Sequence, residues 1–205
     1  MRFSENENML KLFYFHPACS LVSHIALEES GLNFEAIRVE LNNPKDRQHL
    51  LKYNPAGKVP TLLVDGHPLT ENIAILTYIA DNSLNCELLS KTPLLRAKTL
   101  SYLAWSANTV HPAFRQVMRP NYFSSEETAY EGLREKGRSN FWSYLQTIES
   151  QLTHSDWTMG GAFSVADGYT YLFHKWGKLI GLPVEKLPAY ARFAETIVSR
   201  ATVTR

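Results

Sequence analysis

Apolar and polar positions change their period along the chain, and this change predicts two domains of different fold class. Up to residue 82, short apolar stretches alternate with turn signals, as expected for strands and helices that follow one another. Beyond residue 93, apolar residues recur with the period of a helix. The pattern therefore predicts an α/β domain over residues 9–82, a linker over 83–93 and an all-helical domain over 94–205.

The elements expected in the α/β domain follow the order βαβαββα. Strands are predicted over 9–15, 34–41, 61–64 and 67–69, and helices over 18–30, 45–52 and 71–81. Gly31 stands where a helix commonly ends, and Asp65-Gly66 is typical of a tight hairpin turn. The first strand, helix and second strand would form a right-handed parallel unit, to which the hairpin adds antiparallel strands. This order is thioredoxin-like.

Long helices are expected in the second domain. They are predicted over 94–118, 126–153, 164–178 and 188–200. Pro112 predicts a bend in the first of them, because proline interrupts the backbone hydrogen bonds of a helix. Ser164 and Asp167 have the spacing of a capping box at the start of the third.

Composition excludes several classes of protein. The 205 residues include 21 basic and 20 acidic side chains, so the net charge of +1 gives no sign of nucleic-acid binding. No apolar run is long enough to span a bilayer, and the polar residues 1–8 predict a disordered start rather than a signal peptide. We therefore expect a cytoplasmic protein, and Cys19 and Cys86 fit a reducing compartment. The six histidines other than His111 show no close metal-ligand spacing with carboxylates or cysteines, so no metal is expected.

Cys19 stands near the predicted start of the helix over 18–30. A helix N-terminus carries a partial positive charge and free N–H groups, and both favour a thiolate over a thiol. Cys19 is therefore a candidate reactive residue, and Ser20 is the next donor along the chain. The alternatives are a small thiol that packs under the sheet and a serine that only begins the helix.

Five segments resemble, in their order and spacing, the bacterial beta class of the glutathione transferases. They are FYFHPACSLVSHIALEESGL, NPAGKVPTLL, LTENIAILTYIAD, TVHPAF and FSVAD. The resemblance implies an α/β plus all-α protein, with a thioredoxin-like domain followed by a helical bundle. It also implies glutathione as co-substrate, small electrophiles as second substrates, a role in detoxification and a homodimer.

The resemblance also implies where glutathione binds. A cis bond between Val59 and Pro60 is expected to turn the Val59 N–H and C=O outward, toward the cysteinyl backbone of glutathione. The alternative is a simple turn before a strand. Glu71 and Asn72 open a helix whose free N–H groups would hold the γ-glutamyl carboxylate, while the Glu71 side chain meets the ammonium. Glu71 could instead only complement the helix dipole, and Thr70 is expected to cap the helix.

Further site residues follow from the same resemblance. His111, in TVHPAF, is expected near the glutathione thiol, where an imidazole with an ordinary pKa of about 6.5 can donate a hydrogen bond or accept a proton. The alternative is a structural histidine. Asn108, about one turn earlier, is expected to reach the glutathione of the partner subunit. Beta-class members often bind the glycyl carboxylate with a lysine where this chain has Pro44, so Lys45 and Lys58 are the candidate replacements.

The resemblance leaves the reaction open. In conjugation, a glutathione thiolate near Cys19, Ser20 and His111 would attack an electrophile. In the alternative chemistry, Cys19 would form a mixed disulfide with glutathione and act as a thiol-disulfide reductase or a dehalogenase on a disulfide or halogenated substrate. Non-catalytic alternatives are a stress- or transcription-linked scaffold and a carrier of apolar compounds. Six side chains are candidates either for a second-substrate pocket or for the core: Trp105, Phe114, Met118, Tyr122, Phe173 and Trp176.

Overall fold

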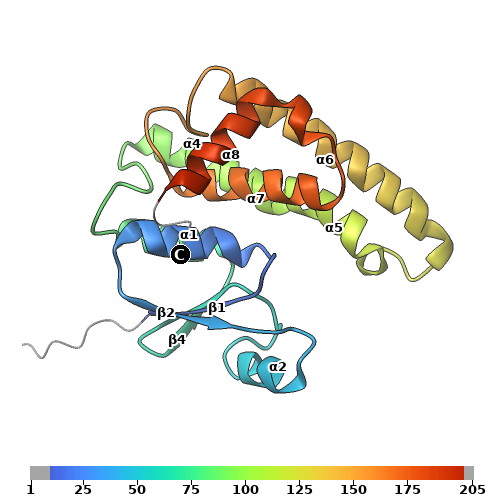
Figure 1. The fold of residues 1–205 in the computed structure, drawn as a ribbon. Coiled ribbons are helices and arrows are strands. Elements are labelled where there is room, and N and C mark those ends of the chain that lie inside the picture. The colour runs from blue at the N-terminus through green and yellow to red at the C-terminus, as the bar shows by residue number, and fades with distance from the viewer. Residues whose placement is uncertain (1–9, 201–205) are drawn as a thin grey trace, which may run out of the picture. The chain divides into compact units, whose positions relative to one another are not determined.

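The computed structural model describes residues 10–200, which form two compact units that divide between Leu89 and Ser90. Figure 1 shows strands with helices in the first unit and helices alone in the second. The expected disorder over residues 1–8 lies outside the described residues, as do Met9 and the last five residues of the predicted helical domain.

The first unit contains a mixed sheet with three helices. Its elements are β1 (Leu10–Tyr14), α1 (Ser20–Ser30), β2 (Phe34–Arg38), α2 (Pro44–Leu51), β3 (Thr61–Val64), β4 (His67–Leu69) and α3 (Asn72–Asp81). The four-stranded sheet has the order β2-β1-β3-β4. Strand β1 pairs in parallel with β2 and antiparallel with β3, which pairs antiparallel with β4. The thioredoxin-like order predicted from the sequence is confirmed.

Both faces of this sheet are covered by helices. Helices α1 and α3 contact each other, and Figure 1 shows α1 over one face of the sheet and α2 beyond the other. On the side of α2, Phe13 packs in a buried cluster with Val39, Leu50 and Leu63. Its neighbour Leu12 is also fully buried, although consecutive strand residues point to opposite faces. Strand β1 is therefore central to the unit and fixes the position of the loop that follows it.

Several boundaries in the first unit differ from those predicted, most of them by one residue. Strand β2 ends at Arg38 rather than residue 41, and α1 begins at Ser20, with Cys19 as its N-cap. The expected cap of α3 is wrong: Glu71, and not Thr70, is the N-cap, and no side chain caps this helix end. The reason is the backbone of Glu71, whose positive φ of 68° makes the sharp entry into the helix.

The second unit is entirely helical. Its elements are α4 (Pro93–Trp105), η1 (Ser106–Val110), α5 (His111–Met118), η2 (Pro120–Tyr122), η3 (Glu127–Ala129), α6 (Tyr130–Leu152), α7 (Val165–Leu179), η4 (Val184–Lys186) and α8 (Pro188–Ser199). Helix α7 is buried along most of its length. Phe141, Leu145, Ile148 and Leu152 are buried on α6, whereas Leu133, which its periodicity also places on the buried side, is half-buried. No helix among residues 10–200 combines the length and apolar character needed to cross a bilayer.

The first long helix is interrupted more strongly than a bend at Pro112 would suggest. Residues Ser106–Val110 form a π-helical turn between α4 and α5. Pro112 has no N–H to donate to the preceding turn, so a regular α-helical ladder cannot run through this point. A widened turn before the proline is one way to accommodate it. Asn108 lies within this turn and His111 immediately follows it.

The start of α7 is held by the predicted capping box. The Ser164 side chain accepts from the Ala166 N–H, and Asp167 Oδ2 accepts from the Ser164 N–H at 2.7 Å. Asp167 Oδ1 accepts from the Thr158 N–H at 2.8 Å, which ties the preceding loop to the same carboxylate. The expected structural role of Asp167 is therefore confirmed.

Candidate functional site

Cys19 is held at the N-terminal end of α1 by a closely bonded loop. The partly exposed thiol donates to the Val59 carbonyl with an Sγ–O distance of 3.5 Å. The fully buried Ser20 hydroxyl donates to the Phe15 carbonyl and accepts from the Phe15 N–H, each at 3.1 Å. Ser20 therefore closes the loop between β1 and α1, which favours the helix-start alternative for this residue over contact with a ligand thiol.

The turn that carries Val59 is organised by a buried asparagine. Asn54 Nδ2 donates to the Lys58 carbonyl at 2.9 Å and to Thr61 Oγ1 at 3.0 Å, and Asn54 Oδ1 accepts from the Ala56 N–H. The bond between Val59 and Pro60 is cis, as predicted. The Val59 carbonyl points at Cys19, so this turn and the start of α1 meet at the thiol.

Glu71 forms the entrance to α3 with an unusual backbone conformation. Its φ of 68° and ψ of 117° lie where non-glycine residues are rare, and residues held in such regions cost about 1–3 kcal/mol. The Glu71 side chain is exposed, and no side chain caps the helix end. The first turn of α3 therefore offers backbone N–H groups and a partial positive charge beside an exposed carboxylate.

Asn72 joins the two helix starts. Its Nδ2 donates to the Cys19 carbonyl at 3.1 Å, and its Oδ1 accepts from the Ser23 hydroxyl at 2.5 Å. Asn72 is 8% exposed and Ser23 is fully buried, so both hydrogen bonds lie inside the unit. Through them the structure brings Cys19 close to the beginning of α3.

The two remaining predicted residues of the first unit, Lys45 and Lys58, have exposed side chains. Lys45 follows Pro44 in the first turn of α2, where the Asn43 side chain caps the helix by accepting from the Lys45 N–H. Lys58 lies in the turn beside Val59. Both lysine side chains are exposed, which leaves either free to contact an anionic group.

In the second unit, His111 lies against an aromatic cluster. Its ring centroid is 4.9 Å from that of Trp176, and Nε2 lies 3.5 Å from Nη2 of Arg115. Burial, and secondarily the Arg115 charge, lowers the pKa of His111 to about 4. The ordinary pKa assumed for His111 is therefore wrong, because burial opposes the charged form of the ring. Asn108 is exposed on the π-helical turn.

Half of the aromatic and apolar candidates for a second-substrate pocket belong to the core. Phe114 stacks on Trp176 with a ring separation of 4.0 Å, and Phe173 also contacts Trp176. All three side chains are buried. Met118 and Tyr122 are exposed, and Trp105 contacts Tyr102 and Tyr144. Residues 10–200 contain no grouping of acidic, histidine and cysteine side chains suited to a metal ion.

Sequence reasoning missed three features of this site. It gave no role to Ser23, which is the partner of Asn72, and none to the side chain of Asn54. It also missed the second cis bond, between His16 and Pro17. Ser20, Glu29 and Ser30 are also buried on α1, so no sequence signal singled out Ser23.

Comparison with protein families gives one match over the first unit. The family described as "Glutathione S-transferase, N-terminal domain" matches residues 9–81. Among curated proteins, "Glutathione S-transferase GstA" of Escherichia coli O157:H7 is 33% identical over 198 residues, which are 95% of each chain.

Solved structures of similar proteins extend over both units. A sphingomonad glutathione S-transferase complexed with glutathione is 35% identical with a TM-score of 0.83. A beta-class glutathione S-transferase from Sphingomonas chungbukensis is 32% identical with the same TM-score of 0.83. Each similarity covers 95% of both chains.

The environment of His111 predicts its titration. Because its folded pKa lies below 6.5, protonation is opposed in the folded state. The contribution of the neutral His111 ring to the free energy of unfolding is therefore complete above about pH 6.5. It is lost as the pH falls toward 4. The ring C–H signals of His111, assigned by their loss in His111→Gln, should titrate in an NMR experiment with a midpoint near pH 4. A midpoint near pH 6.5 would contradict this environment.

Proposed function

Because the chain belongs to the glutathione S-transferase family, we propose that it binds glutathione along the Val59–Pro60 turn and the N-terminal ends of α1 and α3. Glutathione is its co-substrate, and its activity is that of a transferase. The observation that carries the proposed site is the Asn72 side chain, which hydrogen-bonds the Cys19 carbonyl from the first turn of α3. That bond keeps the Cys19 thiol close to the Glu71 carboxylate and to the N-terminal end of α3, which no side chain caps.

Each part of glutathione has a counterpart in this arrangement. The γ-glutamyl carboxylate suits the N–H groups at the start of α3, and the Glu71 carboxylate suits its ammonium. The cysteinyl backbone would pair with the N–H and C=O of Val59 in the manner of an added strand. Lys45 or Lys58 would meet the glycyl carboxylate. The Asn72 side chain would contribute by holding the start of α3 beside Cys19, through its bonds to the Cys19 carbonyl and Ser23.

Glutathione binding would also change the surroundings of Cys19. In the structure the thiol donates to the Val59 carbonyl, and only the protonated sulfur can make that bond. A glutathione backbone N–H donating to the same carbonyl would compete with the thiol. The thiol would then be left at the positive end of α1, where a thiolate is favoured. Occupation of the site would thereby prepare Cys19 for reaction.

Two reactions are compatible with this site. In conjugation, the glutathione thiolate forms a C–S bond with an electrophile, and the leaving group departs with the electron pair of the broken bond. In thiol-disulfide exchange, the Cys19 thiolate attacks a glutathione-containing disulfide, which gives a Cys19–glutathione disulfide and releases the other sulfur as a thiol. A second glutathione then releases oxidised glutathione and regenerates Cys19. The partly exposed cysteine at the helix start favours exchange as an activity beside conjugation.

His111 and Asn108 remain proposed contributors from the helical unit. A neutral imidazole can donate one hydrogen bond to the glutathione sulfur or accept its proton. The low pKa of His111 makes it a weak base at neutral pH, so the hydrogen-bonding role is the better supported of the two. Asn108 would act across a dimer interface, toward the glutathione of the partner subunit.

Removal of the Glu71 charge is predicted to weaken glutathione binding. The ammonium would lose a charged acceptor, so Glu71→Gln should raise the dissociation constant about tenfold or more. Isothermal titration calorimetry measures this directly. The control is Glu127→Gln, which removes the same charge from an exposed position in η3. Equal affinities for wild type and Glu71→Gln would contradict the proposed site, and no binding of wild type at millimolar glutathione would contradict the proposed function.

Substitution of Cys19 is predicted to separate the two reactions. Cys19→Ser should reduce glutathione-dependent reduction of hydroxyethyl disulfide by about 100-fold or more, because the mixed disulfide cannot form. Conjugation of 1-chloro-2,4-dinitrobenzene should stay within about tenfold of wild type, since its nucleophile is glutathione. Cys86→Ser controls for the other cysteine. Full disulfide reductase activity in Cys19→Ser would exclude Cys19 as the exchanging thiol.

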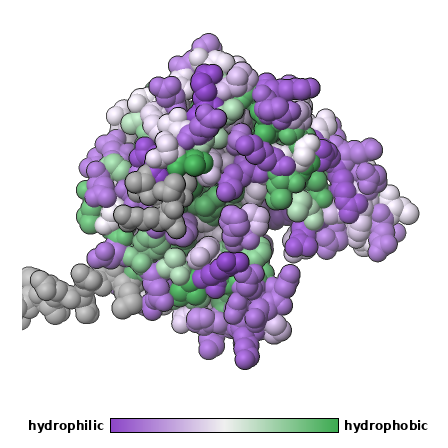
Figure 2. Space-filling model, in the orientation of Figure 1, coloured by the Kyte–Doolittle hydropathy of each residue, from purple (hydrophilic) through white to green (hydrophobic). Residues whose placement is uncertain are grey.

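We further propose that the protein is a cytoplasmic homodimer that acts in detoxification. Large apolar side chains are exposed on both units, among them Leu51, Leu84, Leu94, Met118, Tyr122 and Phe123. Figure 2 shows apolar patches between hydrophilic residues on one face of the molecule. Such patches commonly mark interfaces. Sedimentation equilibrium should give twice the chain mass of 23.3 kDa, and a monomer at micromolar concentration would contradict the dimer.

A further inference from the structure

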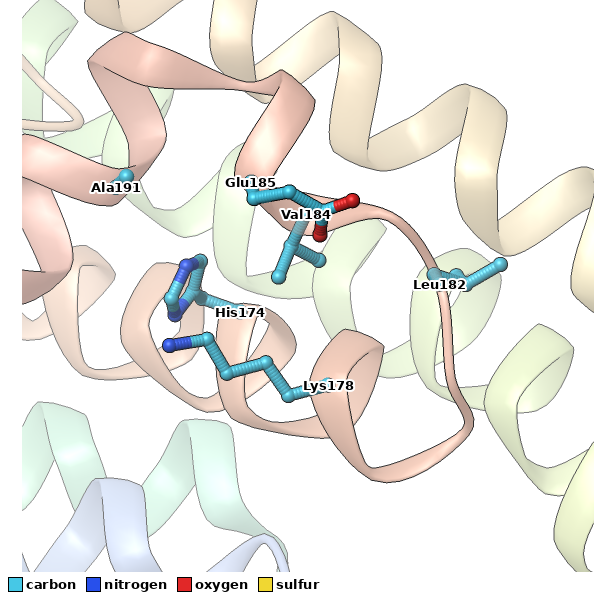
Figure 3. Close-up of a pocket in the computed structure, with 6 residues that line it drawn as sticks. All are labelled: His174, Lys178, Leu182, Val184, Glu185 and Ala191. Carbon is cyan, nitrogen blue, oxygen red and sulfur yellow. The ribbon is translucent and has the colours of Figure 1, made fainter.

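The helical unit contains a cavity that the proposed glutathione site does not use. It has a volume of about 340 Å³ and lies between the C-terminal half of α7, the η4 turn and α8. Its lining residues, drawn in Figure 3, are His174, Lys178, Leu182, Val184, Glu185 and Ala191. The volume falls at the lower end of the range of small-molecule pockets, which is about 300–1,000 Å³.

His174 is a buried polar group with unused hydrogen-bonding capacity. Its side chain is 4% exposed, and its ring lies 5.2 Å from the ring of Tyr190. Among residues 10–200, no residue forms a hydrogen bond with either ring nitrogen. Its nitrogens are not among the buried polar atoms of residues 10–200 that lack a partner, so they reach open space. A ligand in the cavity could therefore replace water at the His174 ring.

Lys178 supplies a positive charge to the same space. It lies one turn after His174 on α7, and Figure 3 shows its ammonium beside the imidazole. No carboxylate of the described residues forms an ion pair with it. Burial, and secondarily this ammonium, lowers the pKa of His174 to about 4, so the imidazole is neutral at pH 7. The two side chains together offer one cation and one neutral N–H donor.

We propose that this cavity binds a small monocarboxylate with an apolar chain, independently of the transferase reaction. The ligand carboxylate would accept from Lys178 and from the N–H of His174. Its hydrocarbon chain would lie against the apolar wall formed by Leu182, Val184 and Ala191. Glu185 lines the cavity on the far side of Val184 from His174 (Figure 3). Its negative charge would oppose a second charge on the ligand, which selects monocarboxylates over dianions such as phosphate.

The test is an NMR titration of the full chain, without glutathione, using hexanoate as the probe and hexanamide as its uncharged analogue. Hexanoate should shift backbone signals of residues 174–191 with a dissociation constant on the order of 1 mM. Hexanamide and inorganic phosphate should each bind at least about tenfold more weakly. Lys178→Met should weaken hexanoate binding about tenfold, and Glu185→Gln should strengthen it.

The matched control is Lys175→Met, which removes the same charge from α7. The Lys175 ammonium lies over the Tyr171 ring, 5.5 Å from its centroid, so this variant should bind hexanoate as wild type does. Equal affinity for hexanoate and hexanamide would reduce the site to an apolar crevice and overturn the proposal. Absence of hexanoate-induced shifts in residues 174–191 would overturn it as well, as would unchanged affinity in Lys178→Met.

Discussion

The hydrogen bonds of Asn72 are the constraint on which the rest of the proposed site depends. One side chain satisfies the Cys19 carbonyl at the start of α1 and the Ser23 hydroxyl in its first turn, and it does so from the first turn of α3. The bond to Ser23 is buried and the bond to Cys19 is partly buried, and loss of a partner costs about 1–3 kcal/mol for each buried group left unsatisfied. The starts of α1 and α3 are therefore fixed to each other. The position of the Cys19 thiol relative to the proposed anion-binding end of α3 is fixed with them.

Other features of the first unit act on the same small region. Ser20 bonds both backbone groups of Phe15 and so fixes the loop before Cys19. Asn54 holds the turn that presents Val59 to the thiol. The strained backbone of Glu71 leaves the first N–H groups of α3 without a side-chain cap. An uncapped helix end suits a charged ligand, because the ligand can supply the missing hydrogen-bond partners, and strained residues often occur at such sites.

Much of this could be predicted from the sequence, and the exceptions have physical causes. Periodicity and turn residues gave the element order and the capping box of α7, because these depend on short-range patterns. The cap at Glu71 was missed because a positive φ is rare for glutamate, and the π-helical turn before His111 was missed because residue types do not show how a helix will accommodate a proline. The pairing of Asn72 with Ser23 and Cys19 joins residues about fifty positions apart, and no local pattern encodes it. The pKa of His111 followed from burial against Trp176, which the sequence could not show.

A crystal structure with glutathione tests the central claim most directly, because it locates all parts of the tripeptide at once. The account predicts the γ-glutamyl carboxylate at the N–H groups that begin α3, the ammonium at Glu71 and the cysteinyl backbone paired with Val59. It also predicts the glutathione sulfur beside Cys19, with the bonds of Asn72 to Ser23 and the Cys19 carbonyl unchanged. Glutathione bound elsewhere, or an Asn72 side chain that leaves Cys19 to contact the ligand, would contradict the account.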